Sequence, residues 1–572
     1  MGRLPAVCLA SAAVAAAVAT TTASCSGAAG TCAEDSVLLQ SSLLQRRTSA
    51  GIVRSASALS LEARRRSERT DRLPLIPYPA SLELPRQVER PFVLTSDTVL
   101  VLPPDVPQDS PVARALRNLL AEAGGASAAA APIARLHLHL DGACAGGNTE
   151  GYELSINAGN MSLRAPTLAG LFYGAQTMRQ LAKRLPGGGE GYVLPGGLRV
   201  SDAPLLAWRG LHLDVSRHFF DAEDVKKLLD TMSLFKLNRF HWHLTDDQGW
   251  RLPIVGYPSL TRLGAESVDG QRRAYTSREI RDVIEYARER YIEVLPEIDV
   301  PGHVAAAIAA YPALGNADIP GWRPPVAPAK EWGAQDFTLG PSNETMYFLR
   351  SVFQQVSELF PSAFAHVGGD EASQRQWSAS EQALAAARSE GLSQVQAYFN
   401  KHVSQLLLEN NRTVVAWDEA QHVGGLPDDA VIMAWRSPDE LRTALLAGRR
   451  VVNADMNALY FDHYQGSEVS EPKAICCHLS LEEVYAYDPM PAWVAEDKEK
   501  RRLFLGVQAQ LWSEYFPNWA HVEYMAFPRA LALAERSWTP GERLQGFEDF
   551  RARLKARMGD LASRGVNSRR LD

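Results

Sequence analysis

Past residue 203 the chain alternates between short apolar runs and longer stretches that carry apolar residues at helical spacing. This alternation is typical of β-strands that are separated by amphipathic α-helices. The clearest predicted helices cover residues 221–236, 277–290 and 344–360. The pattern predicts an α/β fold with eight strands, a (β/α)8 TIM barrel. The predicted strands lie within residues 206–217, 238–246, 291–301, 364–371, 413–419, 431–436, 451–462 and 504–514.

A doubly wound open sheet would show the same alternation, so the ends of the strands matter. Every predicted strand ends in polar or aromatic residues, and barrel enzymes build their active sites at the carboxyl ends of the strands. The presence of such residues at the end of every strand favours the barrel over the open sheet. The residues at these ends are Arg217, Asp246 with Asp247, Asp299 with His303, Asp370 with Glu371, Trp417 with Asp418, Trp435 with Arg436, Tyr460 with Asp462, and Trp512 with Glu514.

The 572 residues divide into four segments. Residues 1–23 have a small-residue apolar core after one positive charge, as a signal peptide does. Residues 24–70 are rich in Ala, Ser and Arg and read as a low-complexity linker or pro-segment. Residues 71–201 combine strand-like runs, a hairpin within 151–165 and a helical pattern within 167–185, which predicts a smaller α+β domain. The barrel takes residues 202–560.

Composition and short motifs limit the classes of binding partner and the cellular destination that we expect for the protein. The net charge is −7 and no folded segment carries a dense basic stripe, so nucleic acid is not an expected partner. Apart from the N-terminal stretch, no apolar run has the length of a spanning helix. The signal peptide and the sequons at Asn160, Asn343 and Asn411 predict a glycoprotein of the secretory pathway, either secreted or lysosomal/vacuolar. The few cysteines fix no disulfide pairing and suggest no zinc site.

The segment FAHVGGDEA, residues 364–372, carries the strongest chemical signal. Neighbouring residues of a strand point to opposite faces, so Asp370 and Glu371 can act on one molecule only if the chain leaves strand geometry. Gly368 and Gly369 permit that. Two close carboxylates in a dry cleft do not ionise equally, so one stays an anion and the other keeps a proton. Together with an arginine for hydroxyl groups and aromatic rings for sugar faces, the pair indicates a carbohydrate site.

The segments WRGLHLDVSRHF, NRFHWHLTDDQGWRL, LPEIDVPGH, HVGGDEA, VVAWDEA and QAQLWSE resemble glycoside hydrolase family 20, the β-N-acetylhexosaminidases. The resemblance covers roughly residues 73–538, including the α+β domain. It implies exo-hydrolysis of terminal β-linked GlcNAc or GalNAc by a substrate-assisted retaining mechanism, in which the 2-acetamido carbonyl of the sugar is the nucleophile. It implies no cofactor and no metal.

The resemblance also implies a role for each site residue. Glu371 would be the acid and base, and Asp370 would orient the acetamido group and stabilise its positive charge. Tyr460 would bind the acetamido carbonyl, and Asp246 and His303 would form a relay to Glu371. The implied substrate-binding residues are Arg217, Trp417, Trp435, Asp462, Trp512 and Glu514.

Two departures from the family pattern bear on specificity. His463 stands where some lysosomal members place an arginine for anionic sugars, so neutral terminal sugars are favoured. Tyr487 stands where bacterial members often have a tryptophan, which leaves stacking on the leaving group open. The expected partners are β-linked N-acetylhexosaminide glycans on oligosaccharides, glycoproteins or glycolipids. The resemblance leaves a homodimer open and no stable membrane span is expected.

Two other functions compete with this one. His241 and His243 form an HxH pair on a strand, and with His303 and His366 they could serve a metal-dependent barrel hydrolase. Histidines flanked by apolar residues are more often packed in a core. The second alternative is a glycan-binding protein that has kept the pocket and lost turnover.

Overall fold

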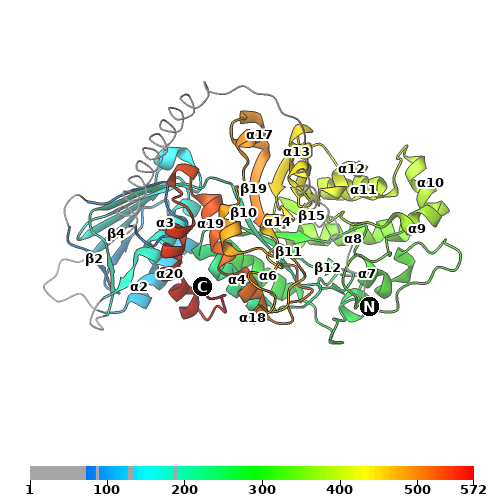
Figure 1. Cartoon of the computed structure of the whole chain (residues 1–572), viewed down its shortest axis with the longest axis horizontal. Helices are drawn as coiled ribbons and strands as arrows, with labels where there is room; N and C mark the ends of the chain where they lie inside the picture. The colour runs from blue at the N-terminus through cyan, green and yellow to red at the C-terminus, as the bar shows by residue number, and fades with distance from the viewer. Residues whose placement is uncertain (1–71, 86–88, 126–133, 186–189, 572) are drawn as a thin grey trace, which may run out of the picture. The chain divides into compact units, whose positions relative to one another are not determined.

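The computed structural model describes residues 72–85, 89–125, 134–185 and 190–571 (Figure 1). The predicted signal peptide and linker therefore lie outside the described residues. Within the described part of the chain, no helix is both long and apolar enough to cross a lipid bilayer.

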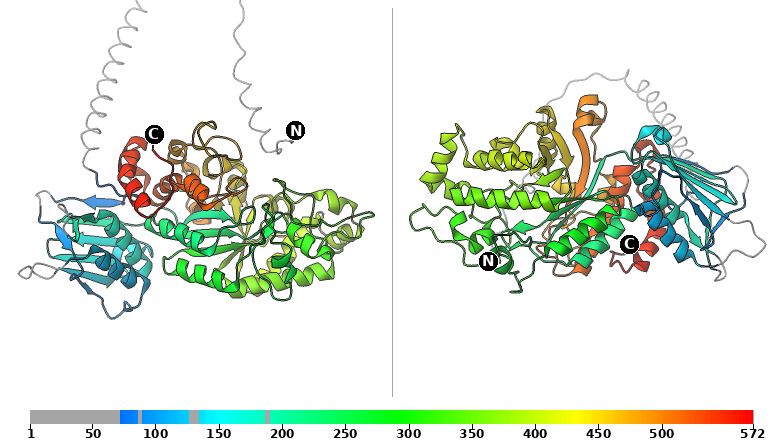
Figure 2. Two further views of the ribbon diagram at one scale, coloured as in Figure 1. Left: turned by 90° about the horizontal axis from the view of Figure 1, so that it is seen from below. Right: turned by 180° about the vertical axis from the view of Figure 1, so that it is seen from behind.

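Eight parallel strands close into a barrel, as predicted, because the first strand pairs with both the second and the last. Figure 2 shows the preceding domain, in blue to cyan, beside the barrel domain, in green to red. The open-sheet alternative is therefore wrong. Each of the eight predicted segments supplies one strand. They are β10 (Trp208–Asp214), β11 (Arg239–His243), β14 (Glu293–Glu297), β15 (Phe364–His366), β16 (Thr413–Trp417), β17 (Val431–Ala434), β18 (Arg450–Asn453) and β19 (Phe504–Ala509).

The predicted barrel helices form with clear starting signals. Helix α4 (Ala222–Leu234) is capped by Asp221, whose side chain accepts hydrogen bonds from two backbone amides. Helix α6 (Ser277–Arg288) begins with a capping box between Thr276 and Glu279. Helix α8 (Asn343–Leu359) is capped by Ser342. Such caps satisfy amides that have no partner inside the helix, which fixes where each helix begins.

The other elements of the barrel domain lie between and after these strands. Its longer helices are α10 (Glu381–Ser389), α11 (Val395–Glu409), α13 (Pro438–Leu446), α18 (Trp519–Ala526), α19 (Arg529–Trp538) and α20 (Phe547–Ser563). Its short elements are β12 (Thr245–Asp246), β13 (Gly249–Trp250), α5 (Ser259–Arg262), α7 (Ala305–Ala310), α9 (Gln374–Ala379), α12 (Glu419–Val423), α14 (Met456–Leu459), α15 (Leu481–Ala486), α16 (Ala492–Ala495) and α17 (Lys498–Leu503).

The preceding α+β domain contains a six-stranded sheet in the order β1-β9-β5-β6-β4-β3 and a three-stranded sheet in the order β2-β8-β7. The predicted hairpin is the antiparallel pair β5–β6. The helical pattern within 167–185 overran the helix, because Lys183 and Arg184 pair with a strand instead. The elements are β1 (Ser81–Glu83), β2 (Phe92–Leu94), β3 (Val99–Val101), α2 (Pro111–Ala123), β4 (Arg135–Leu140), β5 (Tyr152–Ile156), β6 (Asn160–Ala165), α3 (Leu168–Leu181), β7 (Lys183–Arg184), β8 (Tyr192–Leu194) and β9 (Leu198–Asp202).

A buried polar cluster joins this sheet to the barrel. Asp202, the last residue of β9, accepts hydrogen bonds from the Tyr152 hydroxyl (2.7 Å) and from Trp538 Nε1 (3.0 Å). Its charged partner is Lys236 Nζ at 3.1 Å, and both charged side chains are almost fully buried. Burial lowers the pKa of Lys236, while Asp202 opposes that change. The cation therefore depends on its single carboxylate partner.

Replacing Asp202 should destabilise the protein strongly. The Asp202→Ala variant leaves Lys236 buried without its counter-charge, a change that costs about 3–5 kcal/mol when a buried pair loses one partner. Urea unfolding measures the loss. Adding Lys236→Met should recover much of it, and Lys227→Ala, which breaks an exposed pair on helix α4, should cost less than about 1 kcal/mol. Equal losses for Asp202→Ala and Lys227→Ala would contradict the assignment.

Candidate active site

The chain leaves strand geometry directly after β15, as the glycine pair predicted. Gly368 and Gly369 have φ values of +69° and +90°, and Glu371 has a φ of +44°. A β-carbon at Gly368 would lie 1.7 Å from Asp299 Oδ1, so no side chain fits there. The same Asp299 oxygen accepts a hydrogen bond from the Gly369 amide (3.2 Å). The left-handed turn is thus fixed by a carboxylate at the end of the neighbouring strand β14.

The turn brings the two adjacent carboxylates to one histidine. His303 Nε2 lies 3.7 Å from Asp370 Oδ2 and 3.7 Å from Glu371 Oε2. The Asp370 side chain is only 12% exposed, whereas that of Glu371 is 35% exposed. Asp370 Oδ1 is buried and has no hydrogen-bond partner among the described residues. Asp370 therefore faces the interior with one unpaired acceptor oxygen, and Glu371 reaches toward solvent.

Burial and neighbouring charges shift the pKa values of Asp370 and His303. Burial raises the pKa of Asp370 to about 6, with Glu297 and Glu371 adding to the rise and His303 opposing it. Burial disfavours a charge on His303, but Asp246, Asp299 and Asp370 outweigh it and hold the pKa of His303 well above its usual range. His303 is therefore a cation near neutral pH. Of the two acids, the structure places the stronger burial on Asp370.

Asp246 connects this cation to the arginine at the end of β10. Its Oδ1 lies 3.0 Å from His303 Nδ1, and its Oδ2 lies 2.9 Å from Arg217. His243 Nε2 contacts the same Oδ2 at 2.9 Å. Burial would raise the pKa of Asp246, but Arg217 and His303 hold it well below its usual range. Asp246 is thus an anion between two cations.

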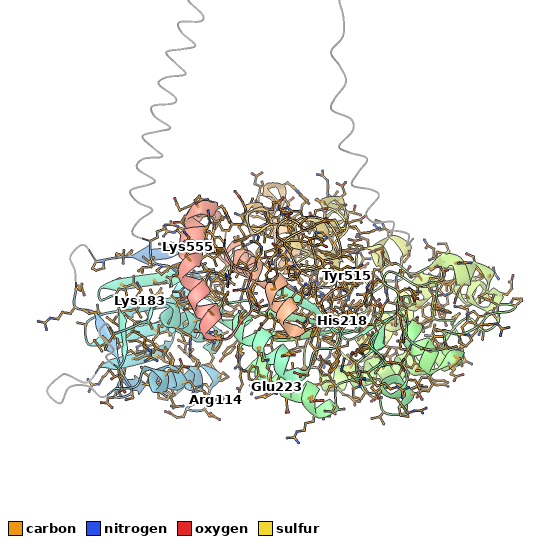
Figure 3. The ribbon with its side chains drawn as sticks, turned by 60° about the horizontal axis from the view of Figure 1, so that its bottom comes forward. Arg114, Lys183, His218, Glu223, Tyr515 and Lys555 are labelled. Carbon is orange, nitrogen blue, oxygen red and sulfur yellow. A yellow bond between two sulfur atoms is a disulfide. The ribbon has the colours of Figure 1, made fainter. Side chains whose placement is uncertain are left out.

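Arg217 is held at the opposite side of the site by further acceptors. Asp214 accepts from it at 3.2 Å, and Gln248 Oε1 accepts from its Nε at 2.9 Å. Glu514 lies 3.9 Å away. The neighbouring His218 binds the backbone oxygen of Ser513 at 2.6 Å, and His218 is labelled in Figure 3. The ends of the first and last barrel strands are therefore tied together at Arg217 and Glu514.

Two buried acceptor oxygens near Arg217 can each accept a further hydrogen bond. Asp462 Oδ1 and Glu514 Oε2 are buried and have no hydrogen-bond partner among the described residues. Burial raises the pKa of Asp462 well above its usual range, and the nearby Glu514 adds to it. Burial also raises the pKa of Glu514, while Arg217 opposes the rise. This part of the site can accept hydrogen bonds from hydroxyl groups.

Three of the four predicted aromatic residues line up along one side of the site. The rings of Trp435 and Tyr460 are stacked with centroids 5.9 Å apart, and Tyr460 lies 6.4 Å from Trp512. Trp417 is only 1% exposed, and its Nε1 donates to Glu297 Oε1 at 2.9 Å. Trp417 therefore packs in the barrel interior, 5.8 Å from Trp512.

Glu297 is a residue that the sequence reasoning missed. It is fully buried, and three histidines surround it: His243 Nδ1 at 2.6 Å, His241 Nε2 at 3.0 Å and His366 Nδ1 at 3.0 Å. The HxH pair thus faces a buried carboxylate inside the barrel. An acidic residue inside the apolar run 291–301 was the signal that could have revealed Glu297.

Glu419 was missed as well. It directly follows the strand-end residue Asp418, and its Oε2 accepts a hydrogen bond from Trp435 Nε1 (2.9 Å). Burial raises the pKa of Glu419 to about 9, with Asp370 and Asp418 adding to the rise. A protonated Glu419 therefore supports the aromatic side of the site. Its sequence neighbours gave no sign of burial, since it begins the short helix α12.

Comparison with known families matches both domains. The model described as "Glycosyl hydrolase family 20, catalytic domain" matches residues 206–541, and the model of the family's domain 2 matches residues 72–203.

Among curated proteins, the chain is 38% identical over 430 residues to a β-hexosaminidase of Porphyromonas gingivalis, covering 73% of this chain and 54% of that protein. It is 33% identical over 419 residues to a β-hexosaminidase of Akkermansia muciniphila, covering 71% and 82%. The chain thus spans about half of the first relative and most of the second.

Solved structures show the same similarity. An exo-β-N-acetylglucosaminidase of this family from Vibrio harveyi, in complex with N-acetylglucosamine, has a TM-score of 0.75 at 29% identity, covering 87% of this chain and 78% of that one. A β-N-acetylhexosaminidase of Streptomyces coelicolor has a TM-score of 0.72 at 28% identity, covering 87% and 98%.

The turn that carries the two carboxylates should not tolerate a side chain at Gly368. The Gly368→Ala variant places a methyl group against Asp299, so it should lose more stability than the roughly 1–2 kcal/mol that a left-handed non-glycine residue costs. Gly270 has a similar φ of +77° and open space around it, so Gly270→Ala should show that backbone cost alone. Thermal and urea unfolding compare the two variants. The same loss for both would show that Asp299 does not confine the turn.

Proposed function

The chain belongs to glycosyl hydrolase family 20, and on that premise we propose that it is an exo-acting β-N-acetylhexosaminidase. Its substrates are glycans that end in β-linked GlcNAc or GalNAc. The reaction retains the anomeric configuration, and the 2-acetamido group of the substrate acts as the nucleophile.

The observation that carries this proposal is the free acceptor on Asp370. Its Oδ1 is buried and has no partner among the described residues, and a buried acceptor left unpaired costs free energy. The N–H of a 2-acetamido group supplies the missing donor. When the acetamido carbonyl attacks the anomeric carbon, the cyclic cation that forms carries positive charge on this nitrogen, and a fixed carboxylate beside it stabilises that charge.

Glu371 then performs the proton transfers. Its partly exposed side chain can reach the glycosidic oxygen, to which it gives its proton as the bond to the leaving group breaks. Water next attacks the anomeric carbon and gives a proton back to Glu371, and the acetamide is restored. The protonated His303 lies 3.7 Å from both acids and favours the anion of Asp370. Tyr460 and Trp435 supply the wall beside the acetamido group.

The other end of the site suits the sugar hydroxyls. Arg217 is fixed by Asp214 and Asp246, so its remaining N–H groups point in a set direction. Asp462 and Glu514 offer unpaired acceptors beside it. A site built to pair hydroxyl groups discriminates strongly against ligands that lack them, because its buried acceptors would then remain unpaired.

We also propose that the terminal sugar is neutral. Burial lowers the pKa of His463 to about 4, with Arg529 adding to the decrease, so His463 is uncharged near neutral pH. It therefore offers no positive charge to a sulfate or carboxylate, in contrast to an arginine at that place.

The secretory destination stays a prediction, and one structural feature supports it. The predicted acceptor residues Asn160, Asn343 and Asn411 are all exposed, as an attached glycan requires. Treatment of protein from a eukaryotic host with an endoglycosidase should lower its apparent mass, and an unchanged mass would contradict glycosylation.

The mechanism requires the acetamido group of the substrate. We expect hydrolysis of aryl β-glycosides of GlcNAc and GalNAc, and little or no hydrolysis of the matched glucoside, which lacks the nucleophile. Removing the anion with Asp370→Asn should lower kcat by about 10²–10³-fold. Removing the acid with Glu371→Gln should lower kcat by about 10²–10⁴-fold on substrates with poor leaving groups. Initial rates measured with each substrate and variant test these expectations.

The matched control is Glu409→Gln, an exposed acid on helix α11 that should leave the rate unchanged. Glycan binding by the wild type without any turnover would instead indicate the silent binding protein. Equal cleavage of the glucoside would contradict the substrate-assisted mechanism.

The activity should decline on the acid side as Asp370 takes up a proton. Because the pKa of Asp370 is raised to about 6, its anion is present above that pH and is lost as the pH falls through it. We therefore expect an acid limb in kcat/KM with an apparent pKa near 6. In Asp370→Asn the residual rate should not show this limb. If the variant showed an acid limb at the same pH, that limb would belong to the titration of another group.

A further inference from the structure

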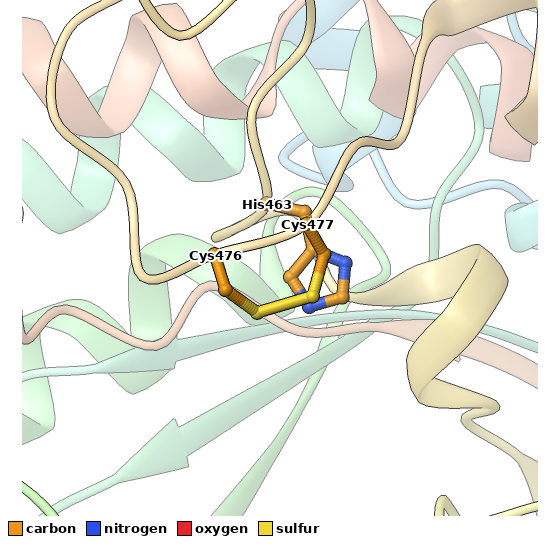
Figure 4. Close-up of side chains that lie close together, drawn as sticks. All are labelled: His463, Cys476 and Cys477. Carbon is orange, nitrogen blue, oxygen red and sulfur yellow. A yellow bond between two sulfur atoms is a disulfide. The ribbon is translucent and has the colours of Figure 1, made fainter. Parts of the chain in front are cut away.

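Two adjacent cysteines form a disulfide in a loop that is hydrogen-bonded to the backbone of Asp462. Cys476 and Cys477 are bonded to each other, and Figure 4 shows their sulfurs next to the ring of His463. One ligand atom from each of the three residues lies within 4.8 Å of the other two. His463 is buried, Cys476 is half-buried and Cys477 is exposed, so reagents in solvent can reach the bond.

The cysteine loop is attached to the backbone that carries Asp462. The Ile475 amide donates to the Asp462 carbonyl (3.3 Å), and the Tyr464 amide donates to the Cys477 carbonyl (3.2 Å). Arg529 donates to the carbonyl oxygens of both His463 (3.0 Å) and Leu479 (2.9 Å), one on each side of this pairing. A change at the cysteine pair therefore acts on the segment that positions the Asp462 side chain.

We propose that the reduced form of this cluster is a binding site for a soft divalent cation of the Zn²⁺ class, with Cys476, Cys477 and His463 as ligands. Thiolates and imidazole are the ligands that such ions prefer. In a tetrahedral site the ligand atoms lie about 3.6–3.8 Å apart, as follows from metal–ligand bonds of roughly 2.0–2.3 Å. The three ligand atoms already lie within 4.8 Å, so side-chain rotations after cleavage of the S–S bond can form the site.

The chemistry needs an external reductant. A phosphine cleaves the disulfide with one water molecule, giving two thiols and a phosphine oxide. Binding of M²⁺ then releases two protons as both thiols become thiolates. Three protein ligands leave the fourth position for water. In the oxidised form both sulfurs are occupied by their mutual bond, so the site exists only in the reduced protein.

Binding of the metal ion to this cluster should also weaken substrate binding. This part rests on the proposed function, because it assumes that Asp462 binds a sugar hydroxyl. A cation held by His463 and the cysteine pair fixes the backbone next to Asp462 in a new arrangement. We expect KM for the aryl GlcNAc substrate to rise several-fold on metal binding, with a smaller effect on kcat.

The test is a Cd²⁺ titration of the full chain before and after reduction with a phosphine that is then removed. Thiol titration should show two additional thiols after reduction. The reduced protein should bind one Cd²⁺ with the charge-transfer absorption of thiolate ligation, and the oxidised protein should not. His463→Gln should weaken binding at least about tenfold, because even the loss of a group that only orients a ligand costs roughly 10–100-fold in metal affinity. No substrate is used, so this result is independent of the proposed function.

The control is the Cys476→Ser/Cys477→Ser double variant, which keeps every other cysteine of the chain. It should show no such binding after reduction, and Cys477→Ala is a second variant if the double one does not fold. Equal Cd²⁺ binding in the double variant would place the ion elsewhere. A disulfide that stays intact in the folded protein, or binding without reduction, would overturn the proposal. Binding with an unchanged KM would refute only the coupling to Asp462.

Discussion

The buried cation of His303 is the interaction on which the site depends. It lies between Asp246 on one side and the Asp370–Glu371 pair on the other, and the carboxylates around it keep its charge despite full burial. A charge in such surroundings is stable only while its partners are in place. The same Asp246 also holds Arg217. One network of close charges therefore positions both the acid pair and Arg217.

The barrel makes this network possible because its strand ends converge. Asp246 follows β11, His303 follows β14 and Asp370 follows β15, so three consecutive strands of the ring supply the core of the site. Asp299 joins two of them by fixing the turn at Gly368 and Gly369. Beneath them, Glu297 and the three histidines around it place charged and polar groups inside the barrel.

Much of this could be predicted from the sequence. The eight strands followed from apolar runs, and the polar residues at their ends followed from the barrel geometry. The turn after His366 followed from two glycines, since only they adopt its φ values without strain. Local patterns carry this information because each depends on a few neighbouring residues.

Other features depend on contacts between distant strands, and a single sequence does not contain them. Trp417 was assigned to the wall of the pocket, and its near-complete burial reflects a hydrogen bond to Glu297 of another strand, which the sequence did not reveal. The surroundings of Glu419 include Trp435 and Asp370, which approach it only in the folded barrel. The unequal burial of Asp370 and Glu371 likewise reflects the turn and its neighbours.

The central claim is that the sugar supplies its own nucleophile while Asp370 steadies the charge on its nitrogen. The most direct measurement compares aryl GlcNAc substrates whose N-acetyl group carries zero, one, two or three fluorine atoms. Fluorine weakens the carbonyl oxygen as a nucleophile, so the account predicts that kcat/KM falls steeply with each fluorine, by orders of magnitude over the series. A rate that stays nearly constant across the series would contradict it, because a protein nucleophile or a water molecule would then attack the sugar directly.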